Sequence, residues 1–282
     1  MEASGEQYPI ERGDRRAVAV EVGGGVRCYS VGERDVLLGY GAGELAAAAR
    51  GQVLAPWPNR LADGRYSFGG RDLQLPIDEP ETRTAIHGLV RFANWDAVEH
   101  ERDRVSLELV LHPQPGYPFL LRLRVSYRLE ERGLAVETTA ENLGEQPAPF
   151  GLAHHPYFAG RADDFEVTLP ARTRLTVDER KLPSGREPNP LPPAFIVGDR
   201  QIDATFTELE EQRVAVGAHE LWFDDAFRYV QLFTGDHPAV GRHGLAVEPM
   251  TCPPDAFRSG EGLIVLGPGA SFRGCWGIAD LL

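Results

Sequence analysis

The sequence lacks the excess of positive charge that proteins binding nucleic acid or anionic membranes carry. Its 282 residues include 29 Lys and Arg against 42 Asp and Glu, a formal net charge of −13. Such partners are bound through clusters of basic side chains that neutralise phosphate groups, and no Lys/Arg cluster of that kind occurs. We therefore predict neither a nucleic-acid nor a membrane partner. A small phosphorylated ligand is still compatible, because one local arginine pocket would suffice.

Long apolar runs and paired cysteines are also missing. No stretch of about 18 apolar residues occurs that could form a transmembrane helix. The polar start, residues 1–16, lacks the apolar core of a signal peptide. Cys28, Cys252 and Cys275 are odd in number and widely spaced, which fits neither a disulfide framework nor a zinc site. We expect a reduced, soluble, cytoplasmic protein.

Helical patterns are scarce. Glu44–Arg50 and Thr207–Gln212 could each form a helix of one or two turns. Neither segment is long enough to be the crossover helix of a parallel sheet. The Gly23-Gly24-Gly25 run is followed by no helical pattern, so it predicts a hairpin turn rather than a phosphate-binding loop.

The dominant sequence period is two. Apolar and polar residues alternate over 105–109, 121–130 and 134–140, and turn signals such as Asp63-Gly64 and Pro268-Gly269 recur at short intervals. This pattern is typical of antiparallel strands with one buried face. We predict an all-β protein, a large antiparallel β-sandwich, formed as a single domain by residues 1–282. The Pro-rich stretch Leu182–Pro193 is predicted to be a long surface loop.

Four segments interrupt the alternation with polar residues. They are Pro56-Trp57-Pro58-Asn59-Arg60-Leu61, Ile86-His87-Gly88-Leu89, His154-His155-Pro156-Tyr157-Phe158 and Val247-Glu248-Pro249-Met250-Thr251. Adjacent residues of a regular strand point to opposite faces, so His154 and His155 cannot both face one pocket. One of these two histidines is therefore predicted to be structural. Glu248 lies in an apolar run, where a buried carboxylate needs a partner or a shifted pKa.

Each polar residue of these segments also has a purely structural interpretation. Arg60 could be a surface arginine, His87 could cap a turn, and Trp57 could be a core aromatic. Together, however, arginine, histidine and glutamate side chains with neighbouring aromatic residues suit a sugar, whose hydroxyls take hydrogen bonds while its C–H face stacks. A carboxylate and an imidazole can also serve as a general base and a general acid near neutral pH.

At these residues the sequence resembles the aldose 1-epimerase (galactose mutarotase) family. The similarity runs from about Leu54 to Gly277, with the motifs in family order. The matching segments are Asn59-Arg60 with Gly64-x-Tyr66-x-Phe68-x-Gly70, His87-Gly88 with Trp95, His155-Pro156-Tyr157-Phe158, and Glu248-Pro249 with Pro254-Asp255-Ala256-Phe257. This resemblance implies a galactose mutarotase-like supersandwich fold.

The resemblance also implies catalytic roles. Glu248 would be the general base, and His155 the general acid, because Pro-Tyr-Phe follows His155 and not His154. The attraction between opposite charges leads us to expect a protonated His155 beside an ionised Glu248 in the resting enzyme. No metal or organic cofactor is expected. His87, His155 and Glu248 could in principle ligate a metal, but no His-x-His or His-Glu-x-x-His spacing supports such a site.

The remaining implied roles concern substrate binding. Arg60 and His87 would hold sugar hydroxyls or the ring oxygen. Beside these implied roles, we predict further substrate contacts from Asn59, Trp57 and Tyr157. The family also has a substrate-binding aspartate before the catalytic glutamate. Asp203, in Asp203-Ala204-Thr205-Phe206, fits this position best, and Asp224 is the alternative.

The predicted function is to interconvert the α and β anomers of a free hexose such as glucose or galactose. One alternative is a hexose-6-phosphate 1-epimerase, for which Arg65, Arg71, Arg83 and Arg91 could supply positive charge. Another is a non-catalytic sugar-binding protein on the same fold. The negative net charge favours a neutral aldose. The preferred sugar, the pathway and the choice between monomer and homodimer are left open.

Overall fold

Antiparallel strands build the protein in a computed structural model that describes residues 2–281. The larger of its two main sheets has twelve strands. Ten of them follow the spatial order β1 (Gln7–Arg12), β2 (Arg15–Val20), β3 (Val26–Val31), β4 (Arg34–Leu37), β16 (Tyr157–Ala159), β25 (Gly244–Met250), β24 (Tyr229–Phe233), β21 (Asp203–Leu209), β18 (Ala171–Val177) and β19 (Pro183–Pro188). The other two are β15 (Ala153–His154), which pairs with β25, and β5 (Val53–Leu54), which pairs with β15.

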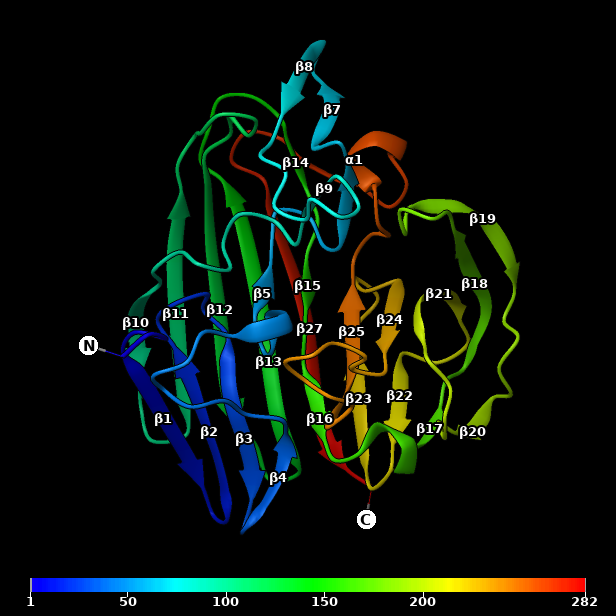
Figure 1. Cartoon of the computed structure of the whole chain (residues 1–282). Helices are drawn as coiled ribbons and strands as arrows, with labels where there is room; N and C mark the ends of the chain where they lie inside the picture. Colours follow the sequence, from blue (N-terminus) through cyan, green and yellow to red (C-terminus); the bar gives the residue numbers. More distant parts are fainter. Residues whose placement is uncertain (1, 282) are drawn as a thin grey trace.

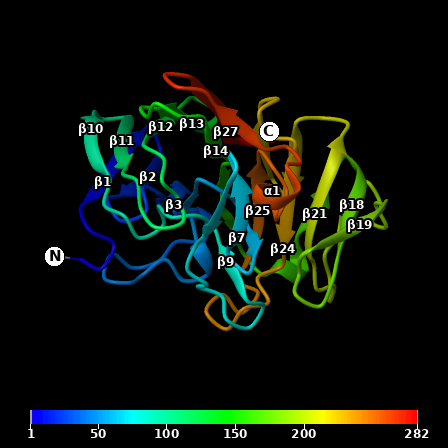
Figure 2. The same cartoon turned by 90° about the horizontal axis from the view of Figure 1, so that it is seen from above.

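The second main sheet has nine strands. Their spatial order is β10 (Asp96–His100), β11 (Arg104–Leu111), β12 (Leu121–Leu129), β13 (Gly133–Asn142), β27 (Ser271–Asp280), β23 (His219–Phe223), β22 (Arg213–Val216), β17 (Glu166–Thr168) and β20 (Ala194–Ile196). Figure 1 shows the strands of both sheets running roughly along one direction, and Figure 2 shows the two layers from above. The predicted all-β antiparallel sandwich is confirmed.

Three small sheets of two strands each and three short helices complete the chain. The pairs are β6 (Arg60–Ala62) with β9 (Thr84–Ile86), β7 (Arg65–Phe68) with β8 (Arg71–Gln74), and β14 (Ala148–Phe150) with β26 (Ile264–Leu266). The helices are the 3₁₀ turns Ala47–Ala49 and Ala162–Asp164 and the helix α1 (Ala256–Ser259). Within residues 2–281, no helix has the length and apolar character needed to cross a membrane.

The core lies between the two main sheets, as the alternation predicts. On β12, the residues Leu121, Leu123, Val125, Tyr127 and Leu129 are all at most 1% exposed, and the residues between them face outward or are only partly buried. The Tyr127 hydroxyl crosses to the other layer, where it donates to the Gly24 carbonyl oxygen at 2.8 Å. One apolar cluster joins residues of both sheets.

Two local predictions are wrong, and a third is confirmed in part. Thr207–Gln212 is not helical, because its first residues continue strand β21 beside β18 and β24. Leu182–Pro193 is not all loop, since it contains β19. This strand lies at the edge of the sheet, where proline is tolerated because no second neighbour needs its missing N–H. Glu44–Arg50 forms only the 3₁₀ turn at Ala47–Ala49.

Strand β25 positions the candidate site, because it lies in the middle of the twelve-stranded sheet and all seven of its residues are buried. Leu245 and Val247 belong to the core between the sheets. By alternation, Ala246 and Glu248 point to the opposite face of the sheet. That face carries the candidate site.

Candidate active site

A cavity of about 560 Å³ opens on this outer face of the twelve-stranded sheet. Its walls come from strands β16, β21, β24 and β25 and from the loops around residues 45–49, 59–60, 79–92, 181 and 236–237. Seven of the eight sequence-predicted site residues line it: Asn59, Arg60, His87, His155, Tyr157, Asp203 and Glu248. Leu45 and Phe92, two of the exposed large apolar residues, also line it.

His155 and Glu248 meet in this cavity. The imidazole Nε2 lies 3.2 Å from the Glu248 Oε1, and the two side chains are 5% and 3% exposed. His155 follows the short strand β15, and Pro156 separates it from β16. The ring of Tyr157 stacks on the imidazole, with centroids 4.9 Å apart and planes 12° apart. The pair is therefore held in contact by two adjacent strands and an aromatic wall.

Burial determines the protonation of this pair. It lowers the pKa of His155 to about 3 and raises the pKa of Glu248 well above its usual range, the latter with help from the negative charge of Asp203. Both directions favour the neutral forms. Burial thus favours a neutral imidazole beside a protonated Glu248 carboxyl. It opposes the charged resting pair expected from proximity, which the attraction between opposite charges favours.

His154 faces the other way. Its Nε2 lies 2.9 Å from the Thr138 hydroxyl of β13, and its ring lies 5.2 Å from that of Trp276 in β27. Both partners belong to the nine-stranded sheet, so His154 is part of the inter-sheet core. The prediction that one histidine of the pair is structural is confirmed.

Arg60 enters the cavity at the start of β6 and is held by Glu79. Its Nε and Nη2 each lie 2.7 Å from one carboxylate oxygen of Glu79. Burial would raise the pKa of Glu79, but hydrogen bonds from Arg60, Thr82 and Thr84 lower it to about 2. Glu79 therefore stays ionised and fixes the guanidinium, whose Nη1 makes a longer hydrogen bond of 3.5 Å to the Asn59 Oδ1.

Asp255, in the Pro-Asp-Ala-Phe segment, supports the site from outside the cavity. Its backbone N–H donates to the Arg60 carbonyl oxygen at 2.7 Å, and its Oδ1 accepts from the Ala62 N–H at 2.9 Å. The residue therefore clamps β6 from both ends. Its backbone has a positive φ of 62°, which places it at the start of α1 in a conformation that few non-glycine residues adopt.

His87 is a neutral hydrogen-bond donor. The Asn59 backbone N–H donates to its Nδ1 at 3.2 Å, so the ring proton lies on Nε2. Burial, supported by neighbouring basic side chains, holds the pKa of His87 well below its usual range. Gly88 next to it has a φ of 75°, and a Cβ there would lie 2.0 Å from the Ala55 carbonyl oxygen. Only glycine lets these two segments approach this closely.

Asp203 reaches the cavity from the first position of β21. Strand register places Thr205 of β21 opposite Gln231 of β24, and Gln231 opposite Glu248 of β25. Gln231 Nε2 donates to the Asp203 Oδ1 at 2.7 Å. Asp224 instead accepts the Cys275 N–H at 2.8 Å in the nine-stranded sheet. The structure thus brings Asp203, and not Asp224, to the cavity of His155 and Glu248.

Trp57 is the predicted site residue that the structure does not bring into the cavity. It is 3% exposed, and its ring packs against Phe257 with centroids 5.6 Å apart. Tyr157, by contrast, lines the cavity, and its hydroxyl donates to the Ala48 carbonyl oxygen at 3.1 Å. It thereby connects the wall behind His155 to the loop at the cavity rim.

A search among known proteins supports the assignment that the motifs suggest. The family model described as aldose 1-epimerase matches residues 6–275. The chain belongs to the aldose 1-epimerase family. Family membership makes the protein an isomerase, and the galactose mutarotase-like fold agrees with the resemblance of its motifs.

Individual relatives are similar to different shares of the chain. The uncharacterized protein YihR of Escherichia coli is 34% identical over 97% of this chain and 92% of its own length. Galactose mutarotase of mouse is 31% identical over 48% of this chain and 41% of its own length. Among solved structures, an aldose epimerase homologue from C. elegans superposes with a TM-score of 0.87 at 16% identity, covering 98% of this chain and 99% of its own.

Several residues of the site were not found from the sequence of this aldose 1-epimerase family member. Glu79, Gln231 and Lys181 line the cavity, but none belongs to a motif. The sequence suggested Arg91 only as a possible source of positive charge for a sugar phosphate. Of the four arginines considered for that role, it alone lines the cavity. No sequence signal marks Glu79 or Gln231, because their roles depend on pairing with Arg60 and Asp203 across the fold.

A metal site in this cavity would need several ligating side chains to converge on one point. Within the described part of the chain, residues 2–281, no group of three or more His, Cys, Asp and Glu side chains is arranged to hold a metal ion. His155 and Glu248 contact each other directly.

Proposed function

We propose that the protein interconverts the α and β anomers of a free hexose such as glucose or galactose. The observation that carries this proposal is the contact of His155 with Glu248 inside a cavity that also exposes Arg60, His87 and Asp203. A carboxylate and an imidazole this close can move two protons on neighbouring atoms of one substrate. The other three groups can hold the hydroxyls of the ring.

The reaction needs two proton transfers in each direction. Glu248, as a carboxylate, takes the proton of the C1 hydroxyl, and His155, as an imidazolium, gives a proton to the ring oxygen O5. The C1–O5 bond breaks, the electron pair stays on O5, and C1 becomes an aldehyde carbon. Rotation about C1–C2 presents the other carbonyl face, and both transfers then reverse during ring closure.

The neutral pair fits this cycle. After ring opening, Glu248 carries a proton and His155 is neutral, which is the state that burial favours. The free protein and the complex with the open-chain sugar therefore share one protonation state of the pair. For a cyclic sugar to react, the proton on Glu248 must first move to His155 across 3.2 Å, helped by the polar atoms of the bound substrate.

A neutral sugar is supported over a sugar phosphate by the charges around the cavity. Arg60 is already paired with Glu79. Arg91 binds Asp78 at 3.2 Å, although its buried Nε finds no hydrogen-bond partner within residues 2–281. Asp203, Asp236 and Glu79 line the same space. A phosphate dianion would thus meet Arg91 and Lys181, each already paired with an aspartate, among several carboxylates.

Polarimetry on freshly dissolved α-D-glucose and α-D-galactose tests the proposal, with glucose 6-phosphate in the same panel. We expect acceleration by the native protein and a loss of about 10²–10⁴-fold in Glu248→Gln and His155→Asn. Wild-type rates in both variants would overturn the residue assignment. Acceleration confined to glucose 6-phosphate would make the protein a sugar-phosphate epimerase, and binding without acceleration would make it a sugar-binding protein.

A further inference from the structure

One cation of the cavity is unusual for this chain. Of the 29 basic residues, Lys181 is the only lysine, so the other 28 are arginine. This single lysine lines the cavity that contains His155 and Glu248. Its side chain is 50% exposed and thus reaches the opening rather than the floor of the cavity. A composition so biased toward arginine makes the position of the one lysine worth explaining chemically.

Lys181 contacts the aspartate that is predicted to bind substrate. Its Nζ lies 2.8 Å from the Asp203 Oδ2, while the other oxygen, Oδ1, accepts from the Gln231 Nε2 at 2.7 Å. The Gln231 amide is itself oriented, because its Oε1 accepts the Thr205 hydroxyl at 2.5 Å. Both oxygens of Asp203 are therefore held by donors, one from the sheet and one from Lys181.

The turn that carries Lys181 is firmly built. Lys181 has a positive φ of 60°, and its N–H donates to the Asp178 carbonyl oxygen at 3.0 Å. The Asp178 carboxylate accepts the N–H groups of Arg180 and Leu182, each at 2.9 Å. A left-handed residue other than glycine persists where its surroundings determine it. The turn thus presents the ammonium at a defined place.

A second anchor ties this turn to the opposite wall. The Arg180 guanidinium donates to the carbonyl oxygens of Thr82 and Arg83 at 2.9 and 3.0 Å. The same loop supplies the Thr82 hydroxyl to Glu79, which holds Arg60. Lys181 and Arg60 are consequently fixed relative to each other, although they lie far apart in the sequence.

An ammonium suits this place for a physical reason. A guanidinium tends to bind a carboxylate through two parallel N–H groups in one plane, whereas an ammonium is a compact charge with three separately directed donors. With one N–H on Asp203, Lys181 has two left. A sugar hydroxyl beside the pair could accept from Lys181 while donating to Asp203, which satisfies both of its hydrogen-bonding functions.

We propose that Lys181 is a positioning residue that orients Asp203. Its ammonium also donates a hydrogen bond to the sugar hydroxyl whose own hydrogen bond Asp203 accepts. This inference rests on the proposed function, because it names a further residue of the same binding site. Lys181 also balances the charge of Asp203 near Glu248. The other charged or titratable groups that face Glu248 are His155 at 3.2 Å, Arg60, and Tyr157. His155 is also faced by His87, whose ring centroid lies 5.5 Å away, and by the charge of Arg91.

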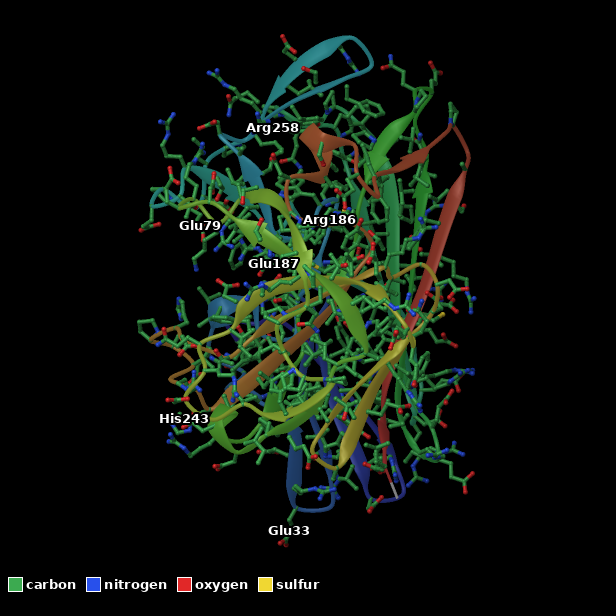
Figure 3. All side chains as sticks on the ribbon, turned by 90° about the vertical axis from the view of Figure 1, so that its right-hand side faces the viewer. Glu33, Glu79, Arg186, Glu187, His243 and Arg258 are labelled. Carbon is green, nitrogen blue, oxygen red and sulfur yellow. The ribbon has the colours of Figure 1, made fainter. Side chains whose placement is uncertain are left out.

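Kinetics of three variants test the proposal. Lys181→Met removes the ammonium and keeps the chain length, Lys181→Arg keeps the charge, and Arg186→Gln is the matched control. Arg186 is an exposed cation of β19 that pairs with Glu261 and does not line the cavity. Figure 3 labels both Arg186 and Glu79, a residue that does line the cavity. We expect KM to rise about tenfold in Lys181→Met, the loss of one charged hydrogen bond, and to stay unchanged in Arg186→Gln.

The pH profile separates positioning from mere structural support. Without the ammonium, the charge of Asp203 is uncompensated, and it favours protonation of both His155 and Glu248. Because the proposed reaction needs one group of the pair protonated and the other deprotonated, its rate should have a bell-shaped pH profile. Both limbs of this profile should move to higher pH in Lys181→Met and return toward the native positions in Lys181→Arg. A native KM and a native profile in Lys181→Met would overturn the proposal, provided that the native protein is active.

A binding measurement keeps the outcome independent of turnover. Biosynthetic incorporation of lysine carrying ¹³C at Cε and ¹⁵N at Nζ labels only Lys181 and keeps its three N–H donors, because no other lysine exists. The Lys181→Arg variant takes up no labelled lysine and is the blank that identifies the NMR signal. We expect the Lys181 signal to shift as glucose or galactose is added, and an unmoved signal at saturating sugar would contradict the contact. A shift without any mutarotation would refute the proposed function and leave the role of Lys181 in binding intact.

Discussion

Two histidines that are adjacent in the sequence lie in two different regions of the molecule. His154 and His155 are both buried, and burial lowers the pKa of each to about 3. His154 meets the Thr138 hydroxyl and Trp276 between the sheets, while His155 meets Glu248 in the cavity. Burial and imidazole chemistry are thus common to both. The partner decides the role, since only a carboxylate can exchange a proton with the ring near neutral pH.

The largest expected contrast is in catalysis. His155→Asn should lose about 10²–10⁴-fold in mutarotation rate because O5 loses its proton donor. His154→Asn should keep the native rate per folded molecule, since its ring contacts no group of the cavity. Polarimetry at matched concentrations of folded protein measures both. Equal losses in the two variants would show that the histidine at 155 acts through packing and not through proton transfer.

The next contrast is in stability, where His154→Asn should have a larger effect than His155→Asn. His154→Asn removes a ring packed against Trp276 and disturbs the hydrogen bond with Thr138. We expect the free energy of unfolding to fall by about 1–3 kcal/mol, from lost packing and an altered hydrogen bond. Urea unfolding followed by tryptophan fluorescence measures this change. A loss in His155→Asn as large as that in His154→Asn would break the proposed division between core and site.

The response to acid sharpens the comparison further. The folded pKa of His154 is about 3, and its ordinary value is 6.5. Between these values the unfolded chain binds a proton that the folded chain does not, so stability is present above pH 6.5 and falls as the pH drops toward 3. In His154→Asn, the decline between pH 6.5 and 5 should be shallower. Unfolding curves at several pH values test this, and an unchanged slope would contradict it.

The smallest effect is expected at Trp57, which the sequence analysis predicts to contact the substrate. Its ring packs in the core beside Phe257, and its indole Nε1 has no hydrogen-bond partner in residues 2–281. Trp57→Phe should cost about 1–2 kcal/mol of stability through lost packing and leave KM unchanged. A raised KM with native stability would return Trp57 to the list of substrate contacts.

Much of the site could be predicted because it lies in contiguous motifs. The His-Pro-Tyr-Phe and Glu-Pro segments mark His155 and Glu248 directly, and the alternation of a strand already requires His154 and His155 to face opposite sides. Glu79, Gln231 and Lys181 could not be found in this way. Their importance comes from hydrogen bonds to Arg60 and Asp203. These two residues are separated from their partners along the chain, so no local motif joins them.

The sequence by itself determined the all-β class and the antiparallel strands, and it marked the two residues that we propose as the acid–base pair, because period-two alternation and short motifs are local properties. It could not decide between Asp203 and Asp224, since both lie in similar polar–aromatic contexts. Only the strand register of β21, β24 and β25 brings Asp203 beside Glu248. The protonation of the pair was also decided by the tertiary structure, because desolvation depends on what surrounds a side chain and not on its neighbours in the sequence.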